Sequence, residues 1–554
     1  MPTFKVKVKW GKETYPDVEA NTDEDPLLFK AQLFALTGVQ PERQKVMLKG
    51  TTLRDTDWGN VKLKDGITVL LMGSKEEDVP KEPVEKTLFV EDMSETEIAN
   101  ALDLPAGLIN LGNTCYMNAT VQCLKTVPEL RESLKKYPGV VSLLSGVGAG
   151  GGSTVAAAQS ITAALRDLYD SMERRGLGSL ANAQGSAIHP LILLQVLHTA
   201  FPRFAEKTDH GGFVQQDANE CWTEMVRMLQ QKLPPLDVAE NSVGEKPKSL
   251  VEQFFGGTHS TELKCVESED EPVTNGKESF LQLSCFISQD VRYMLSGLRS
   301  KMQEQITKFS PTLERDAVYT KTSKISRLPA YLTVQFVRFY FKEKEAINAK
   351  ILKDVKFPLL FDAFELCSSE LQQKLTPMRA KFKELEDKRV EDSQKADGPQ
   401  KGTKGHGEKS EKPPVPTRKE PYWFPEDIGS NNSGYYQLQA VLTHQGRSSS
   451  SGHYVAWVRQ ERKPTNVASA TSAAVAKAAG GLGETWLKCD DEAVVEVTEE
   501  DVLKLSGGGD WHCAYVLLYG PRVLEVPLEE HEEENDSAKV DDTVQAMETS
   551  AKSP

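Results

Sequence analysis

The alternation of hydrophobic and polar residues predicts a small mixed domain at the start of the chain. Residues 4–10 alternate strictly between apolar side chains and lysines, the pattern of a half-buried strand. Phe29, Leu33 and Leu36 follow helical spacing, and Gly38 is a natural end for that helix. The predicted order is β-β-α-β-β, with strands around 4–10, 15–20, 46–48 and 67–71.

This stretch, residues 1–75, resembles ubiquitin in its length, its order of elements and its Lys49-Gly50 turn. A conjugated modifier ends in a free Arg-Gly-Gly tail, whereas here the chain continues after Leu71-Met72-Gly73. The resemblance therefore implies a built-in β-grasp ubiquitin-like domain that docks on other proteins. The alternative is another small β-grasp module.

The rest of the chain is predicted to hold one large domain with biased insertions. Charged and proline-containing sequence over 76–103 is typical of a linker, and the second domain spans 104–520. The tail, 521–554, holds three basic and ten acidic residues and is expected to be disordered. Flexible or disordered insertions are predicted by glycine-rich, Lys/Gly/Pro-rich and Ala/Gly/Ser-rich sequence near 144–154, 391–420 and 461–483.

Charge and composition narrow the class of function. The 554 residues are 39% hydrophobic with a net charge of −15, so a general nucleic-acid or anionic-membrane binder is disfavoured. No apolar run reaches the length of a membrane span, and the N-terminus lacks the apolar stretch of a signal peptide. The eight cysteines stand singly, without a C-x-x-C pair. We therefore expect a cytoplasmic protein, with the nucleus as a second setting, and neither nucleic-acid nor membrane partners.

Cys115 is the strongest candidate for a nucleophile. Glycines and asparagines over 107–114 predict a tight turn with free backbone donors, and the residues that follow can form a helix. A cysteine at a helix N-terminus lies where the helix dipole favours the thiolate, and a nearby Asn amide can donate to an oxyanion. The alternative is a buried structural cysteine.

His453 is the candidate base and Asp490 its candidate orienting acid. His453 follows the run Ser448–Gly452 and begins an apolar strand-like segment, which would present an imidazole on a rigid support. Asp490 closes the short strand that begins at Trp486. The order Cys, His, Asp matches papain-like thiol chemistry. A satisfied histidine and a solvated turn acid are the alternatives.

A fourth cluster, Gln215–Glu220, runs into an amphipathic helix. Asp217 is placed to cap that helix, and its carboxylate could also accept hydrogen bonds from an extended substrate backbone.

Taken in order, these motifs resemble the ubiquitin-specific protease family of deubiquitinases, over roughly 104–520. The family resemblance rests on this set of segments: Gly107–Ala119, Gln215–Glu220, Leu328–Phe339, Gly434–Leu438, Gly452–Val455, Trp486–Asp491 and Ala514–Tyr519. It implies an α+β fold, in which the β-grasp domain precedes a papain-like catalytic domain of fingers, palm and thumb. With its ubiquitin-like domain the chain is most similar to proteasome-associated members.

The resemblance also implies the reaction and the roles of residues. The enzyme would cleave the isopeptide bond after the C-terminal glycine of ubiquitin on conjugated proteins, without a cofactor. Cys115 would be the nucleophile, His453 the base, Asp490 its orienter and Asn110 an oxyanion donor. The ubiquitin tail would contact Gln216, Asp217, Ser450 and Gly452. The ubiquitin-like domain would bind the regulatory particle of the 26S proteasome.

Two departures and two rival functions accompany the resemblance. Many members carry a four-cysteine zinc site in the fingers, whereas here Cys265 and Cys285 stand alone, so no metal site is predicted. Cys489 stands where the family usually has Phe, a change expected to affect packing. The rivals are a catalytically silent ubiquitin-binding scaffold on the proteasome and a metal protein. The intact Cys, His and Asp argue against the scaffold, and the lack of short ligand spacings argues against the metal protein.

Two loops are predicted to border the cleft, near Tyr340–Lys350 and His444–Gly452. By the resemblance, such loops can block the path of the ubiquitin tail, so the free enzyme should be slow and docking should stimulate it. Phosphate on Ser450 would add about −1.5 to −2 charges beside the site and push its loop open. The alternative is a passive serine-rich spacer.

Overall fold

The computed structural model describes most of the chain in two compact units, Met1–Met93 and Ser94–Pro554. The predicted linker, the insertions near 144–154 and 461–483, most of that near 391–420, and the tail beyond 527 lie almost wholly outside the described residues. The described ranges are 3–55, 57–59, 62–74, 105–142, 154–176, 187–236, 246–342, 347–396, 417–448, 451–460, 485–509 and 511–527.

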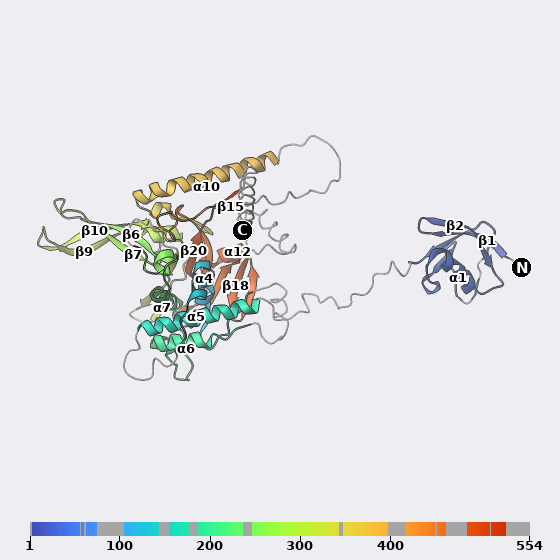
Figure 1. Ribbon diagram of the computed structural model, residues 1–554, viewed down its shortest axis with the longest axis horizontal. Coiled ribbons are helices and arrows are strands. Elements are labelled where there is room, and N and C mark those ends of the chain that lie inside the picture. Colours follow the sequence, from blue (N-terminus) through green and yellow to red (C-terminus); the bar gives the residue numbers. More distant parts are fainter. Residues whose placement is uncertain are drawn as a thin grey trace, which may run out of the picture. The chain divides into compact units, whose positions relative to one another are not determined.

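The first unit is a five-stranded sheet covered by one helix (Figure 1). Strand order is β2-β1-β5-β3-β4, with β1 and β5 parallel and the other neighbours antiparallel. This confirms the predicted order of elements and adds one short strand, β4. The strands are β1 (Thr3–Trp10), β2 (Glu13–Asn21), β3 (Lys45–Leu48), β4 (Thr51–Thr52) and β5 (Thr68–Met72), with the short 3₁₀ helix η1 (Pro41–Arg43) before β3.

The helix of this unit, α1 (Pro26–Thr37), is capped at both ends. The Asp25 carboxylate accepts from the Leu27 N–H, and Gly38 ends the helix with a φ of 74°. Phe29 and Leu33 are buried as predicted, but Leu36 is 46% exposed. The spacing identified the inner face of the helix correctly, but it does not show which turns of that face the sheet covers.

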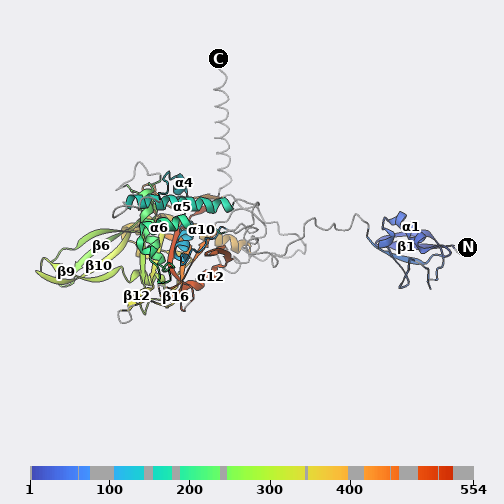
Figure 2. The same ribbon diagram turned by 90° about the horizontal axis from the view of Figure 1, so that it is seen from below.

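The second unit begins with a helical part whose apolar faces share one core. Figures 1 and 2 show these helices on one side of the large sheet. The helices are α3 (Cys115–Leu124), α4 (Pro128–Lys136), α5 (Thr154–Gly176), α6 (Leu191–Ala200), η4 (Pro202–Ala205), α7 (Ala218–Lys232) and α8 (Leu250–Phe255).

A ten-stranded sheet forms the centre of the unit and carries the predicted base and acid. Its main path is β19-β18-β17-β16-β20-β11-β8, and β12, β13 and β14 join beside it. The strands are β8 (Leu283–Phe286), β11 (Leu332–Val337), β12 (Phe339–Lys342), β13 (Ile347–Lys350), β14 (Leu360–Asp362), β16 (Tyr435–Ser448), β17 (Ser451–Arg459), β18 (Trp486–Asp490), β19 (Ala493–Val497) and β20 (Cys513–Pro521). Its short helices are α9 (Met294–Arg299), η5 (Phe364–Leu366), α12 (Glu499–Leu503) and η6 (Lys504–Ser506).

A four-stranded antiparallel sheet, ordered β7-β6-β10-β9, projects from this body (Figures 1 and 2). Together with the helical part and the large sheet it gives the thumb, palm and fingers layout that the resemblance implies. Cys265 packs with Ala317 and Tyr319 inside the fingers, whereas Cys285 lies in the palm core. The strands are β6 (Gly257–Cys265), β7 (Thr274–Phe280), β9 (Gln303–Ser310) and β10 (Arg315–Arg327).

Two segments predicted to be disordered are ordered at their edges. Helix α10 (Ser369–Ala396) extends past residue 391, and β15 (Thr417–Lys419) pairs with β21 (Glu525–Pro527). The start of the acidic tail thus joins the end of the insertion in a small ribbon. Composition could not predict this, because the strands that pair are distant in sequence.

Candidate active site

Cys115 is the first residue of α3, as the turn before it predicts. Gly112 and Asn113 have φ values of 100° and 54°, which turns the chain sharply into the helix. The Asn110 side chain stabilises this turn, because its Oδ1 accepts from the N–H groups of Gly112 and Thr114 at 3.0 and 3.1 Å. The Cys115 residue is only 2% exposed, so the thiol sits at the helix N-terminus and largely out of solvent.

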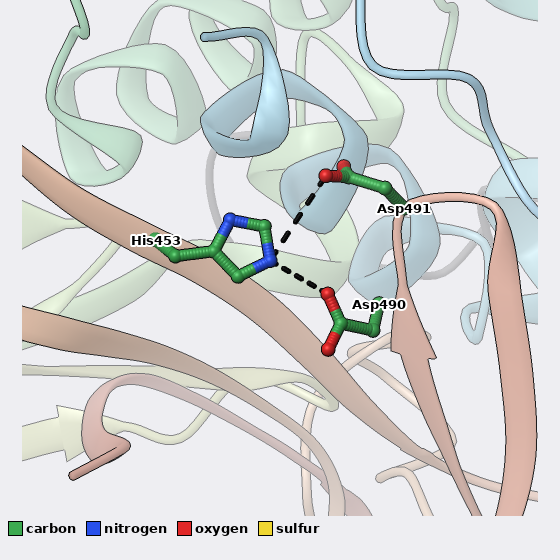
Figure 3. Close-up of side chains that lie close together, drawn as sticks. All are labelled: His453, Asp490 and Asp491. Atoms are coloured by element: carbon green, nitrogen blue, oxygen red, sulfur yellow. Dashed lines mark hydrogen bonds and ion pairs between the residues drawn. The ribbon is translucent and has the colours of Figure 1, made fainter.

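His453 and Asp490 come from neighbouring strands and meet as the sequence predicts. Strands β17 and β18 are antiparallel, with Ala456 opposite Cys489. This register brings His453 Nε2 to 2.6 Å from Asp490 Oδ1, as Figure 3 shows. The His453 side chain is 34% exposed and the Asp490 side chain 30%, so the pair is half-buried.

The electrostatics of this pair suit a thiol nucleophile. The hydrogen bond that His453 donates to Asp490 is the largest cause that raises the pKa of His453 to about 10, and the interaction of His453 with Cys115 is the next. In turn His453 is the largest cause that holds the pKa of Asp490 well below its usual range. An imidazolium beside a cysteine favours the thiolate, the reactive form.

Asp491 is a site residue that the sequence did not single out. Its carboxylate accepts from Asn110 Nδ2 and Asn118 Nδ2, each at 2.9 Å, and its carbonyl accepts from the Leu108 N–H. Asp491 adopts a left-handed φ of 51°, which aims its side chain at the Cys115 turn. It therefore ties the strand that carries Asp490 to the turn that carries Cys115.

Asp217 caps α7 as predicted, with its Oδ1 accepting from the N–H groups of Asn219 and Glu220. The Tyr515 hydroxyl also donates to this carboxylate, at 2.9 and 2.8 Å from its two oxygens. Burial raises the pKa of Asp217 despite these bonds. Its neighbour Gln216 is half-buried, and its amide lies 3.5 Å from the carbonyl of Val214.

The two segments predicted as loops are hairpin arms that meet. β16 reaches Ser448 and β17 starts at Ser451, so the prediction of a loop over His444–Gly452 was wrong; Ser450 lies outside the described residues. β12 and β13 form the second hairpin, and Ala349 pairs with Ser448. The serines and glycines predicted a flexible loop. The backbone there forms a strand instead, because hydrogen bonding between paired backbones does not depend on the side chains.

Gly452 is held at a position that only glycine fits. Its φ is 119°, and a Cβ there would lie 2.1 Å from the carbonyl oxygen of Gln445 and 2.7 Å from His444 Nε2. The next residue is His453, so any shift of this backbone moves the imidazole.

Gly452→Ala is therefore expected to lower the free energy of unfolding by about 1–3 kcal/mol and to reduce turnover. Thermal unfolding and hydrolysis of a ubiquitin C-terminal amide measure the two effects. Gly509→Ala is the control, because no atom lies within 4 Å of its added Cβ. Equal behaviour of the two variants would contradict this reading of Gly452.

His453, Asp490 and Asp491 also form a cluster that could offer metal ligands. Their acceptor atoms are already used, however. Lys488 Nζ lies 2.8 Å from Asp490 Oδ2, and two asparagine amides occupy Asp491. The arrangement therefore fits acid–base chemistry better than cation binding.

The part of the chain that the structure describes contains no helix long and apolar enough to cross a membrane.

Comparisons with known proteins show which family the chain belongs to. The family model "Ubiquitin carboxyl-terminal hydrolase" matches residues 106–519. Ubiquitin carboxyl-terminal hydrolase 6 of Arabidopsis thaliana is 38% identical over 95% of this chain and 100% of its own length. Ubiquitin carboxyl-terminal hydrolase 14 of Caenorhabditis elegans is 38% identical over 94% of each chain. A solved structure of the SAGA Ubp8/Sgf11/Sus1/Sgf73 DUB module bound to ubiquitin aldehyde is 19% identical, with a TM-score of 0.43, over 76% of this chain and 70% of that one.

Proposed function

The chain belongs to the ubiquitin carboxyl-terminal hydrolase family of cysteine-dependent deubiquitinases, and on this premise we propose that Cys115, His453 and Asp490 carry out its reaction. The bond cleaved is the isopeptide bond after the terminal glycine of ubiquitin on conjugated proteins. The observation that carries the proposal is the imidazole of His453, which interacts with Asp490 on one side and Cys115 on the other.

The two ring nitrogens of His453 have separate tasks. Nε2 is engaged by Asp490, which leaves Nδ1 for the thiol. His453 holds Cys115 as the thiolate, which attacks the carbonyl carbon of the terminal glycine. The imidazolium then donates its proton to the leaving lysine amine, and a thioester remains on Cys115. His453 next removes a proton from water, which attacks the thioester and releases ubiquitin.

The oxyanion formed on attack would be bound next to the N-terminus of α3. The backbone N–H groups there point out of the helix and are suited to negative charge. Asn110 is the side-chain donor. One of its two amide N–H groups donates to Asp491, and this bond fixes the orientation of the amide.

The tail of ubiquitin would lie between α7 and the two hairpins. Asp217 is the recognition carboxylate, because its Oδ2 accepts only from Tyr515 among the described residues and has capacity for a backbone N–H of the tail. Gln216 lies beside it, and Gly452 allows close approach of an extended chain. Ser450, which lies outside the described residues, would also contact the tail.

The first unit would dock the enzyme on the regulatory particle of the 26S proteasome. Its fold supports this role, since one face of its sheet exposes Lys5, Lys7 and Lys9 together with Leu70 and Met72. Because β13 pairs with β16, the strand that lies opposite His453, docking that shifts either hairpin would open the path of the tail, as would phosphate on Ser450. The cytoplasm is the proposed location, with the nucleus second; all eight cysteines are free thiols.

Deletion of residues 1–75 tests this docking role. The second unit has its own cores, so the truncated enzyme should keep its intrinsic hydrolysis of a ubiquitin C-terminal amide within about twofold. It should lose retention by immobilised proteasome and the stimulation that proteasome provides. Retention equal to that of the full chain would contradict the docking role, and lost intrinsic activity would contradict the independence of the two units.

A further inference from the structure

Both oxygens of the Asp490 carboxylate are engaged, by two different donors. Oδ1 accepts from His453 Nε2 at 2.6 Å, and Oδ2 accepts from Lys488 Nζ at 2.8 Å. Lys488 lies two residues before Asp490 on β18, so their side chains leave the same face of the sheet. The ammonium thus occupies the one side of the carboxylate that the imidazole leaves open.

The surroundings of Lys488 fix its position. It lies directly across from Trp457 on β17, and its Nζ is 5.8 Å from the centre of the indole ring. The ring is buried, and its Nε1 donates to Thr443 Oγ1 at 3.1 Å. The Lys488 side chain is 25% exposed, which is less than is usual for a lysine. The contact with Asp490 is therefore built by packing as well as by charge.

We propose that Lys488 is a positioning residue of the reaction, which holds the Asp490 carboxylate so that Oδ1 faces His453. The inference rests on the proposed roles of His453 and Asp490. A carboxylate bound at one oxygen can rotate about its Cβ–Cγ bond and release the imidazole. Fixing the second oxygen removes that freedom and keeps the ring directed at Cys115.

Lys488 also sets the charge balance around the pair. Its ammonium contacts Asp490 on its own strand and acts by charge on His512 before β20, while His453 on β17 binds the other oxygen of Asp490. Burial, followed by the charge of Lys488, lowers the pKa of His512 to about 4, so that ring is neutral where the enzyme works. Lys488 is thus a second cation beside Asp490, after His453, and it moderates how strongly Asp490 holds the proton on His453.

The alternative is an ion pair that only adds a little stability. Partly exposed pairs often contribute almost nothing, and removing such a pair would leave catalysis unchanged or scale it equally at every pH. A positioning cation behaves differently. Its removal raises the proton affinity of Asp490 and of His453, so both limbs of the pH–rate profile must move to higher pH.

The experiment compares Lys488→Met with Lys488→Arg and with the control Lys504→Met in the full chain. Lys504 makes an ion pair of the same 2.8 Å length with Asp501, in the short helices η6 and α12. With a ubiquitin C-terminal amide as substrate, Lys488→Met should lower kcat about tenfold, change KM little and move both pH limbs upward. Lys488→Arg should restore most of kcat, and Lys504→Met should match the wild type.

A second comparison separates positioning from folding. On an Asp490→Ala background Lys488→Met should cause no further loss, because the carboxylate it acts on is gone. If Lys488→Met unfolds, Lys488→Gln keeps a donor without the charge and should show the same upward shift. Unchanged pH limbs, or an equal loss on the Asp490→Ala background, would overturn the inference. Failure of the wild type to react through Cys115 would instead overturn the proposed function.

Discussion

Cys115→Ala is expected to lower hydrolysis of a ubiquitin C-terminal amide by at least about 10³-fold while ubiquitin still binds. The substitution removes the attacking sulfur from the N-terminus of α3 and leaves the turn around it intact, because Asn110 holds that turn through backbone N–H groups. Steady-state hydrolysis and a binding titration with ubiquitin measure the two properties separately.

Cys123→Ala is the matched control. Cys123 lies in the same helix and is 1% exposed, but burial raises the pKa of its thiol well above the usual value. It is therefore an unreactive packing residue, and its replacement should keep most of the activity at a small cost in stability. Retained turnover in Cys115→Ala, or comparable loss in both variants, would place the nucleophile elsewhere.

Asp490→Asn should have the next largest effect, a loss of about 10²–10⁴-fold in kcat. The carboxylate is the largest cause of the raised pKa of His453, so the amide should lower that pKa from about 10. The alkaline limb of the pH–rate profile should then move to lower pH. Profiles of wild type and variant between pH 5 and about 10.5 measure the shift.

The same change has a signature in stability. In the wild type the raised pKa of His453 stabilises the fold fully below its ordinary value of 6.5, and this contribution is lost as pH rises through about 10. The dependence of Tm on pH over that window should therefore be weaker in Asp490→Asn.

Asp491→Asn separates the two neighbouring acids. Asp491 Oδ2 lies 4.0 Å from His453 Nε2 and accepts from Asn110 Nδ2, while Asp491 Oδ1 accepts from Asn118 Nδ2. Replacing Asp491 should disturb the turn that carries Cys115 and so lower kcat. The alkaline limb of the pH–rate profile should stay where it is in the wild type. If the alkaline limb of the pH–rate profile moves in Asp491→Asn and not in Asp490→Asn, then Asp491 and not Asp490 is the acid that orients His453.

Local pattern was enough to predict much of this architecture. Helical spacing and a glycine stop predicted α1, and the turn before Cys115 predicted a helix over Tyr116–Thr126, where the structure has Cys115–Leu124. His453, at the start of one strand-like run, and Asp490, at the end of another, were predicted to be partners from the order Cys, His, Asp and from the family resemblance, and the register of β17 and β18 places them 2.6 Å apart. For the two helices, the neighbours along the chain determine the structure.

The features that the sequence missed depend on contacts between distant segments. Asp491 could be read only as a turn acid, because its role comes from a left-handed φ and two amides more than 300 residues away in sequence. The serines and glycines near Ser448 predicted a loop in place of the end of β16. The pairing of Ser448 with Ala349 joins segments far apart in sequence, so no pattern near either residue predicts it. No sequence motif singles out Lys488, and only its short distance to Asp490 in the structure suggests a role for it in the site.

The most direct test of the account is the reaction of the full-length enzyme with a ubiquitin that carries a thiol-reactive electrophile at its C-terminus. We expect a single covalent adduct, mapped by mass spectrometry to Cys115 and absent from Cys115→Ala. An adduct on any of the other seven cysteines, or none on folded enzyme that binds ubiquitin, would contradict the assignment of Cys115 as nucleophile.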